Sequence, residues 1–341
     1  MFESELSIIP KPTSTSILSG KLNLKLIKYI ALSNNSESEK KCGKRFQTFL
    51  SGLNSLEFIG KDSSNINTIF IELDSASNIE DEGYSLKIGK NNSIKLLAST
   101  SSGLFYGFQT FRQLCDSELE RGIIKNPFIQ NCEILDSPRF GYRGMHLDVS
   151  RHFFDVNFIK TYIDMIAFHK MNVFHWHLTD DNGWRIEIDN YPELTKKAAW
   201  RVDRRHEPWK EWSPIKKGEK ATYGGFYNKG EIKEVVEYAS DKHIKIIPEI
   251  EMPGHTSEVF SAYPELSCSG KYIPVNPGSY WPNLDIFCAG NDSVFTFLEN
   301  VLDEVIDLFP GNYIHIGGDE ADKTVWKKCP KCQKKIKDEG L

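Results

Sequence analysis

Short apolar runs alternate with amphipathic stretches along the chain, and the pattern changes near Pro138. Before that point, strand-like runs cover 22–32, 68–73, 83–88 and 93–97. Helical spacing of apolar residues covers 36–50 and 104–114. Asn91 and Asn92 mark a hairpin turn between the last two strands. No catalytic groups gather in this half. We therefore predict that residues 1–137 form a small α/β (α+β) N-terminal domain with a structural role.

After Pro138 the chain alternates strictly between strands and helices. The predicted strands are 144–149, 173–178, 244–250 and 313–316. The predicted helices are 158–171, 231–240, 294–309 and 321–340. This βαβαβαβα order is typical of a parallel sheet with helical crossovers. A doubly wound sheet and a (β/α)8 barrel both fit it.

Polar clusters at the strand ends favour the barrel. They are Asp148–Arg151, Thr179–Arg185, Glu251–Thr256 and Gly317–Glu320. Each follows the C-terminal end of a strand, the face on which barrel enzymes carry their active sites. A full barrel has eight strands and about 250 residues. We therefore predict a (β/α)8 TIM-barrel type fold in which residues 138–341 supply only about the first four βα units, and a chain truncated after the fourth strand.

Composition narrows the classes of partner and cofactor. The chain has 341 residues and a net charge of −5, which argues against a nucleic-acid partner. No apolar run reaches the ~18–20 residues of a membrane span, and no signal peptide is visible. All seven tryptophans, Trp184 and Trp281 among them, follow residue 175 and suit sugar stacking or core packing equally. The seven cysteines include one CxxC, Cys329 to Cys332, which alone is weak evidence for zinc, so we expect reduced thiols, no metal and no cofactor.

The segment Tyr313–Glu320 has the most direct chemical implication. A short apolar run ends at two glycines, and Asp319 and Glu320 follow. Two carboxylates at the end of a buried strand are costly unless they bind or react with something. The glycines allow the backbone to turn, so that one acid can protonate a leaving group while the other holds a substrate group. A capping role at the start of the next helix explains the two acids about equally well.

Histidines and arginines at the other strand ends leave alternatives open. His175 and His177 lie on one face of their strand and suit a metal-dependent hydrolase, although packed core histidines explain them better. Arg143 is suited to recognising vicinal hydroxyls, whereas Arg151 is better explained by a structural ion pair. His255 follows a tight turn, and Asp180 and Asp181 can orient it towards Glu320 and tune the proton affinity of that acid.

Four motifs follow one another along the chain: Arg143–Phe153, His175–Arg185, Glu249–Thr256 and His315–Glu320. Together they resemble glycoside hydrolase family 20, the β-N-acetylhexosaminidases, of bacterial type. The segments 223–227, 288–292 and 8–12 also resemble family members, so that the likeness covers essentially the whole chain. Asn182 stands where many bacterial relatives have glutamine.

The resemblance implies a (β/α)8 barrel that removes terminal β-linked GlcNAc or GalNAc with retention of configuration. In this substrate-assisted mechanism the 2-acetamido oxygen attacks the anomeric carbon and forms an oxazolinium ion. Glu320 is then the general acid and base, and Asp319 orients the acetamido group. Asp180 and His255 support the acid. Three further residues are assigned to substrate binding: Arg143, which binds hydroxyls, Asp181 and Trp184.

The implied partner is an amino-sugar oligosaccharide or glycoconjugate, and a homo-oligomer is one option. The family favours a periplasmic or secreted location, which the N-terminus does not support. Because barrel strands 5–8 are absent, an inactive fragment or a carbohydrate-binding remnant is the alternative reading. A metal-dependent hydrolase is the less favoured one.

Overall fold

The computed structural model of the chain describes residues 6–63, 66–278 and 285–341. Trp281, considered above for sugar stacking, lies outside the described residues. Contacts within the chain divide it into two compact units, residues 1–143 with 165–171, and residues 144–164 with 172–341. No helix in the described part of the chain combines the length and the apolar character needed to cross a membrane.

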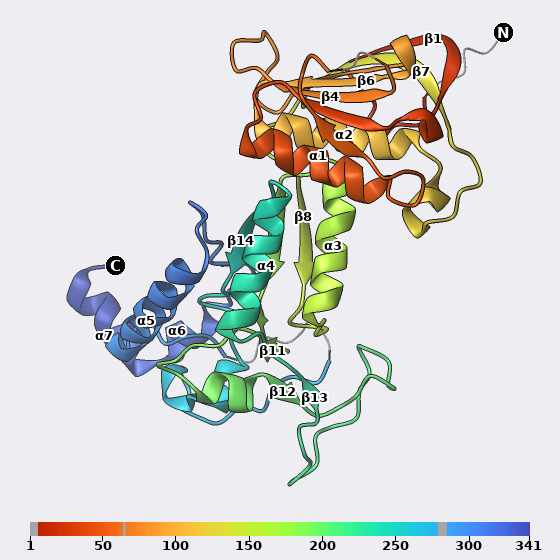
Figure 1. Cartoon of the computed structure of the whole chain (residues 1–341). Coiled ribbons are helices and arrows are strands. Elements are labelled where there is room, and N and C mark those ends of the chain that lie inside the picture. The colour runs from red at the N-terminus through yellow and green to blue at the C-terminus, as the bar shows by residue number, and fades with distance from the viewer. Residues whose placement is uncertain (1–5, 64–65, 279–284) are drawn as a thin grey trace, which may run out of the picture. The chain divides into compact units, whose positions relative to one another are not determined.

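The first unit is built on a seven-stranded mixed sheet with the order β1-β7-β5-β6-β4-β2-β3. Its strands are β1 (Ser14–Asn23), β2 (Tyr29–Leu32), β3 (Glu57–Ile59), β4 (Thr68–Leu73), β5 (Tyr84–Ile88), β6 (Ile94–Ala98) and β7 (Phe128–Asp136). Helices α1 (Glu37–Phe49) and α2 (Ser101–Leu114) lie side by side on one face of this sheet (Figure 1). Phe46 fills the space between the two helices, with ring centroids 4.9 Å from those of Phe108 and Phe111.

Most of the predicted elements of this unit are confirmed, including both helices and the antiparallel β5–β6 hairpin. The single strand predicted over 22–32 is wrong. A 3-10 turn over Leu24–Leu26 divides it, because the side chain of Asn23 accepts a hydrogen bond from the Lys25 N–H and caps the turn.

The second unit is built on a three-stranded parallel sheet with the order β14-β9-β8. The strands are β8 (Gly144–Asp148), β9 (Val173–His177) and β14 (Lys245–Glu249). The main helices are α3 (Val156–Phe168), α4 (Lys229–Asp241), α5 (Asp292–Leu308), α6 (Thr324–Lys328) and α7 (Pro330–Glu339). Two small hairpins, β10 (Thr179–Asp180) with β11 (Gly183–Trp184) and β12 (Trp200–Arg201) with β13 (Tyr223–Gly224), lie in the loops (Figure 1). Within the described residues the sheet is open and does not form a closed barrel.

Two predictions for the end of the chain are corrected. The fourth strand shrinks to a single parallel bridge between Glu249 and His315, since the backbone turns away at Gly317, whose φ is +63°. The single helix predicted over 321–340 is broken into α6 and α7. The break falls at Pro330, which has no N–H to donate and therefore begins a new helix at its first position.

Candidate active site

The alternation of side chains along the parallel strands gathers polar groups on one face of the sheet. In β9, Phe174 and Trp176 are fully buried, whereas His175 and His177 point to the opposite face. The strand register places His146 beside His175, and Glu249 beside His177. The isolated bridge then places His315 beside Glu249. Residues far apart in the chain therefore form one polar cluster.

Glu249 is the centre of this cluster. Its two oxygens lie 2.7 Å from His175 Nε2 and 2.7 Å from His315 Nδ1. Burial opposes its ionisation, but the hydrogen bond with His175 and the charges of the neighbouring histidines lower its pKa to about 2. His177 Nε2 also lies 2.9 Å from the carbonyl oxygen of Thr179. His175 and His177 are thus held by hydrogen bonds, although His175, Glu249 and His315 have the spacing of a three-ligand metal site.

The two acids lie on the turn that follows the bridge residue. Gly317 and Gly318 have φ angles of +63° and +102°, and Glu320 also has a positive φ of +47°. A positive φ in a non-glycine residue stores strain, and such residues concentrate at functional sites. The side chains of Asp319 and Glu320 are 62% and 55% exposed. They are therefore open to a ligand.

His255 connects these exposed acids to buried ones. Its Nε2 lies 3.3 Å from Glu320 Oε2 and 3.6 Å from Asp319 Oδ2. On the other side of the ring, Nδ1 lies 3.1 Å from Asp181 Oδ2 and 3.3 Å from Asp180 Oδ1. Hydrogen bonds with Asp180 and Asp181 raise the pKa of His255 to about 11. The buried imidazole is therefore positively charged at neutral pH, and it faces the two exposed acids.

Each buried aspartate has its own support. The Asp181 carboxylate accepts hydrogen bonds from the Ser257 N–H and hydroxyl, at 3.1 and 2.7 Å. Burial raises the pKa of Asp180, but hydrogen bonds with His177 and His255 and the charge of Arg151 lower it to about 2. Arg151 lies 2.6 Å from Asp180 and 3.0 Å from Asp148. The predicted ion pair of Arg151 is confirmed.

Glu251 lies directly beneath the turn. A Cβ atom on Gly317 would stand 1.7 Å from Glu251 Oε2, so only glycine fits above this carboxyl group. Burial and the charge of Asp319 raise the pKa of Glu251 to about 8. Glu251 is therefore protonated at neutral pH, while the exposed pair stands immediately above it.

The structure brings together five of the predicted site residues, namely Asp180, Asp181, His255, Asp319 and Glu320. It does not bring Arg143 to them. Arg143 precedes the first residue of β8, at the end of the strand opposite to the cluster, and its guanidinium donates to Glu82 and to the Lys170 carbonyl. Trp184 is 1% exposed and donates its indole N–H to the Ile186 carbonyl, so its ring is part of the core.

Family comparisons agree with this arrangement. The profile of the glycosyl hydrolase family 20 catalytic domain matches residues 140–341, and that of domain 2 of the same family matches residues 5–137. The chain belongs to glycosyl hydrolase family 20. It is 43% identical over 286 residues to a β-hexosaminidase of Porphyromonas gingivalis, covering 83% of this chain and 34% of that protein. It is 35% identical over 337 residues to the β-hexosaminidase of Vibrio furnissii, covering 98% and 52%.

Solved structures of family 20 enzymes resemble the chain in three dimensions. The N-acetyl-β-hexosaminidase of Streptomyces plicatus, in complex with Thio-NAglucal, has a TM-score of 0.81 at 32% identity, covering 97% of this chain and 62% of that one. The β-N-acetylhexosaminidase of Bacteroides fragilis has a TM-score of 0.77 at 35% identity, covering 98% and 60%. The chain thus spans about half or less of the curated relatives named above. Membership of the family indicates an N-terminal domain followed by a (β/α)8 barrel type fold.

Three members of the site have a role that the sequence did not suggest. The sequence indicates Glu251 only as part of a polar cluster, and it assigns no role to Ser257, which stands two residues after His255. Arg151 was expected to form an ion pair, but not with Asp180, the acid that supports His255. The short distance along the chain between Ser257 and His255 is the one sequence feature that could have indicated a role for Ser257. The contacts of Asp180 with Arg151 and of Glu251 with Gly317 could not be predicted, because they depend on the register of the sheet.

Proposed function

We propose that this chain carries the acid–base machinery of a retaining exo-glycosidase that removes terminal β-linked GlcNAc or GalNAc. The observation that carries the proposal is the connected series from Asp181 through His255 to Glu320, with Asp319 beside it. The names of the related enzymes support the choice of an N-acetylated amino sugar as substrate. In this assignment residues 1–137 are the accessory domain, and residues 138–341 are the N-terminal half of the barrel.

The proposed mechanism is substrate-assisted. Glu320 donates a proton to the glycosidic oxygen as the leaving group departs, and it later takes a proton from the attacking water. Asp319 accepts a hydrogen bond from the acetamido N–H of the substrate. This orients the carbonyl oxygen of the same group towards the anomeric carbon, which it attacks. The negative charge of Asp319 also stabilises the positive charge that develops on the resulting oxazolinium ring. The substrate supplies the nucleophile, so the enzyme needs no carboxylate on the opposite side of the sugar. Two neighbouring acids on one turn are therefore sufficient.

The charged His255 determines how Glu320 works. The imidazolium, 3.3 Å from Glu320 Oε2, holds the Glu320 carboxyl group in position while it gives up its proton and later takes one back. Asp180 and Asp181 keep that imidazolium charged, and Ser257 orients Asp181. His255 and the two aspartates are therefore positioning residues, whereas Asp319 and Glu320 touch the substrate.

The test uses the complete natural protein and aryl β-glycosides. We expect hydrolysis of the aryl β-GlcNAc or β-GalNAc substrate and none of the matching glucoside, which lacks the acetamido group. Successive fluorination of the N-acetyl group weakens its oxygen as a nucleophile, so the rate should fall steeply along that series. A rate that is insensitive to fluorination, or unchanged in Asp319→Asn, would exclude the substrate-assisted assignment.

The same assay separates the alternatives. A carbohydrate-binding remnant binds GlcNAc but turns over no substrate. A metal-dependent hydrolase would have His175, Glu249 and His315 as ligands. It would lose activity when a chelator is added, and a His175→Ala variant would also be inactive. Added metal would restore the activity of the chelated wild type but not that of the variant.

A further inference from the structure

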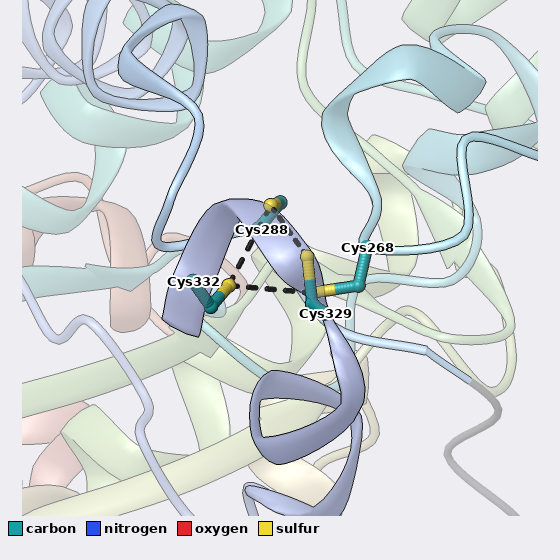
Figure 2. Close-up of side chains that lie close together, drawn as sticks. All are labelled: Cys268, Cys288, Cys329 and Cys332. Carbon is teal, nitrogen blue, oxygen red and sulfur yellow. Dashed lines mark hydrogen bonds between the residues drawn. The ribbon is translucent and has the colours of Figure 1, made fainter. Parts of the chain in front are cut away.

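Four of the seven cysteines meet in the second unit, although they are far apart in the sequence. The sulfur atoms of Cys268, Cys288, Cys329 and Cys332 all lie within 4.8 Å of one another. Figure 2 shows their side chains converging from two loops and from the start of α7. Three of these residues are buried and Cys268 is partly buried, and all four are free thiols. We propose that these four cysteines form a tetrathiolate site for one structural Zn²⁺ ion.

The spacing of the sulfur atoms fits a tetrahedral ion. Sγ of Cys332 lies 3.8 Å from Sγ of Cys268 and 3.7 Å from Sγ of Cys288, and Cys288 lies 3.7 Å from Cys329. Zn–S bonds of about 2.3 Å at tetrahedral angles separate the sulfurs by about 3.8 Å. A disulfide needs a separation of about 2.05 Å. Three of the six sulfur separations therefore have the edge length of a ZnS4 tetrahedron, and four thiolates are a donor set that Zn²⁺ prefers.

The fold holds the four ligands in place before any ion is considered. An antiparallel bridge between Ser267 and Phe287 joins the two loops that carry Cys268 and Cys288. The Trp326 indole donates to the Phe287 carbonyl at 2.8 Å and so ties α6 to the same bridge. Cys329 is the N-cap of α7, and Cys332 lies in its first turn. The ligands are therefore presented by backbone that is fixed by its own hydrogen bonds.

A backbone N–H group donates to one of the four sulfurs. The Gly290 N–H donates to Cys332 Sγ at 3.3 Å. A Cβ atom on Gly290 would come within 2.3 Å of the Cys332 nitrogen, so that this approach requires glycine. N–H groups that donate to thiolate sulfurs orient metal ligands and stabilise their negative charge.

The charges near the cluster also favour a metal thiolate. A Zn²⁺ ion with four thiolates has a net charge of −2, and the segment 323–337 has seven lysines. The positive end of the α7 dipole points at Cys329 and Cys332. Because thiolates and not thiols bind the ion, metal binding releases protons and weakens in acid.

The role of the ion follows from what surrounds it. Across residues 321–341, all of which the structure describes, Cys329 and Cys332 are the only buried residues. The cluster is therefore the core of the segment that follows Asp319 and Glu320. A structural metal contributes its binding free energy to folding, so Zn²⁺ would hold α6 and α7 against the loops at Cys268 and Cys288.

The first test is the metal content of the complete protein, purified from its natural source with a reductant and without chelators. We expect one zinc per chain by elemental mass spectrometry. A protein with less than a tenth of an equivalent of zinc overturns the proposal, and so does one equivalent of iron in its place. Disulfides between these cysteines, found by mass spectrometry of the alkylated protein, also overturn it.

The second test assigns the ligands. Co²⁺ replacing the ion should give the intense visible absorption of a tetrahedral site, with sulfur-to-cobalt charge-transfer bands. Cys332→Ser should lose or shift these bands, and Cys115→Ser, a control outside the cluster, should keep them. Retention of both bands and zinc in Cys332→Ser overturns the assignment. Removing zinc from the wild type should raise amide exchange in α6 and α7, and neither measurement depends on glycosidase activity.

Discussion

Glu39 and Glu251 are buried carboxyl groups, one in each unit, and their surroundings differ. Glu39 is fully buried and accepts hydrogen bonds from the N–H groups of Asn34, Ser36 and Leu73. For Glu251 Oε2 the described residues provide no hydrogen-bond partner, and its pKa is raised to about 8 by burial and by Asp319. The first unit uses its acid to cap a helix and join it to a strand. The second unit keeps a protonated carboxyl group, one oxygen of which has no partner among the described residues, beside its exposed acids; such groups are typical of sites that do chemistry.

The largest expected effect tests whether the exposed acids react. In the complete protein, Glu320→Gln should lower kcat by about 10³-fold, because it removes a general acid while preserving shape. The Tm should not change, since the side chain is exposed. Steady-state kinetics and thermal unfolding measure the two quantities. A kcat within threefold of the wild type would show that Glu320 is not the general acid.

The next effect tests the support of His255. Asp181→Asn should lower kcat by about 10²-fold, because it removes one of two negative charges that keep the imidazole protonated. The pKa of His255, about 11 in the wild type, should fall, so that activity is lost at a lower pH on the alkaline side. The control is Asp189→Asn, an exposed partner of Lys229. An unchanged pH profile with reduced kcat would indicate a packing role instead.

A smaller effect is expected in the first unit. Glu39→Ala should lower the free energy of unfolding by about 2–3 kcal/mol, because buried N–H groups lose a charged acceptor. The kcat per folded molecule should stay the same. Denaturant unfolding measures the first quantity, and Glu37→Gln, in the same helical turn, is the matched control. A loss of kcat in folded Glu39→Ala would remove the contrast between the two units.

The smallest effect concerns Glu258, which is fully buried and whose carboxyl oxygens have no hydrogen-bond partner among the described residues. Burial raises its pKa well above the ordinary value. The unfolded chain therefore loses this proton first as pH rises, and stability falls above the ordinary glutamate pKa. Glu258→Gln should stabilise the protein by about 1 kcal/mol at neutral pH and by nothing at pH 4.

The control for that experiment is Glu265→Gln, an exposed glutamate on the following turn. Its stability should follow the wild type at both pH values. A Glu258→Gln gain that is equal at the two pH values would show that the effect is packing and not ionisation.

The alternation of apolar and polar residues and the positions of glycines predicted helices, strands and turns well, because these elements depend on neighbouring residues in the sequence. The alternation in β9 separated His175 and His177 from Trp176, and the two glycines located the Asp319–Glu320 turn. Arg143 was assigned to substrate binding by resemblance, yet it stands before β8. Because a strand rises about 3.3 Å per residue, five residues separate it from the cluster end by about 16 Å along the strand.

Contacts between distant segments could not be predicted in the same way. The loops of Cys268 and Cys288 are joined by the Ser267–Phe287 bridge, and neither loop has a periodic pattern from which the pairing could be predicted. The pairing of Glu251 with Gly317 likewise depends on the register between Glu249 and His315. The break between α6 and α7, by contrast, could have been predicted from Pro330, because proline disrupts the interior of a helix.

Gly317 and Glu251 constrain each other's substitution during evolution. Any side chain at position 317 would enter the space of the Glu251 carboxyl group, and the φ of +63° adds a second cost. A change at 317 can therefore be accepted only after residue 251 has become shorter, and that first change leaves a void beneath the turn that carries Asp319 and Glu320. The two positions should vary together or not at all among relatives that keep the pair of acids.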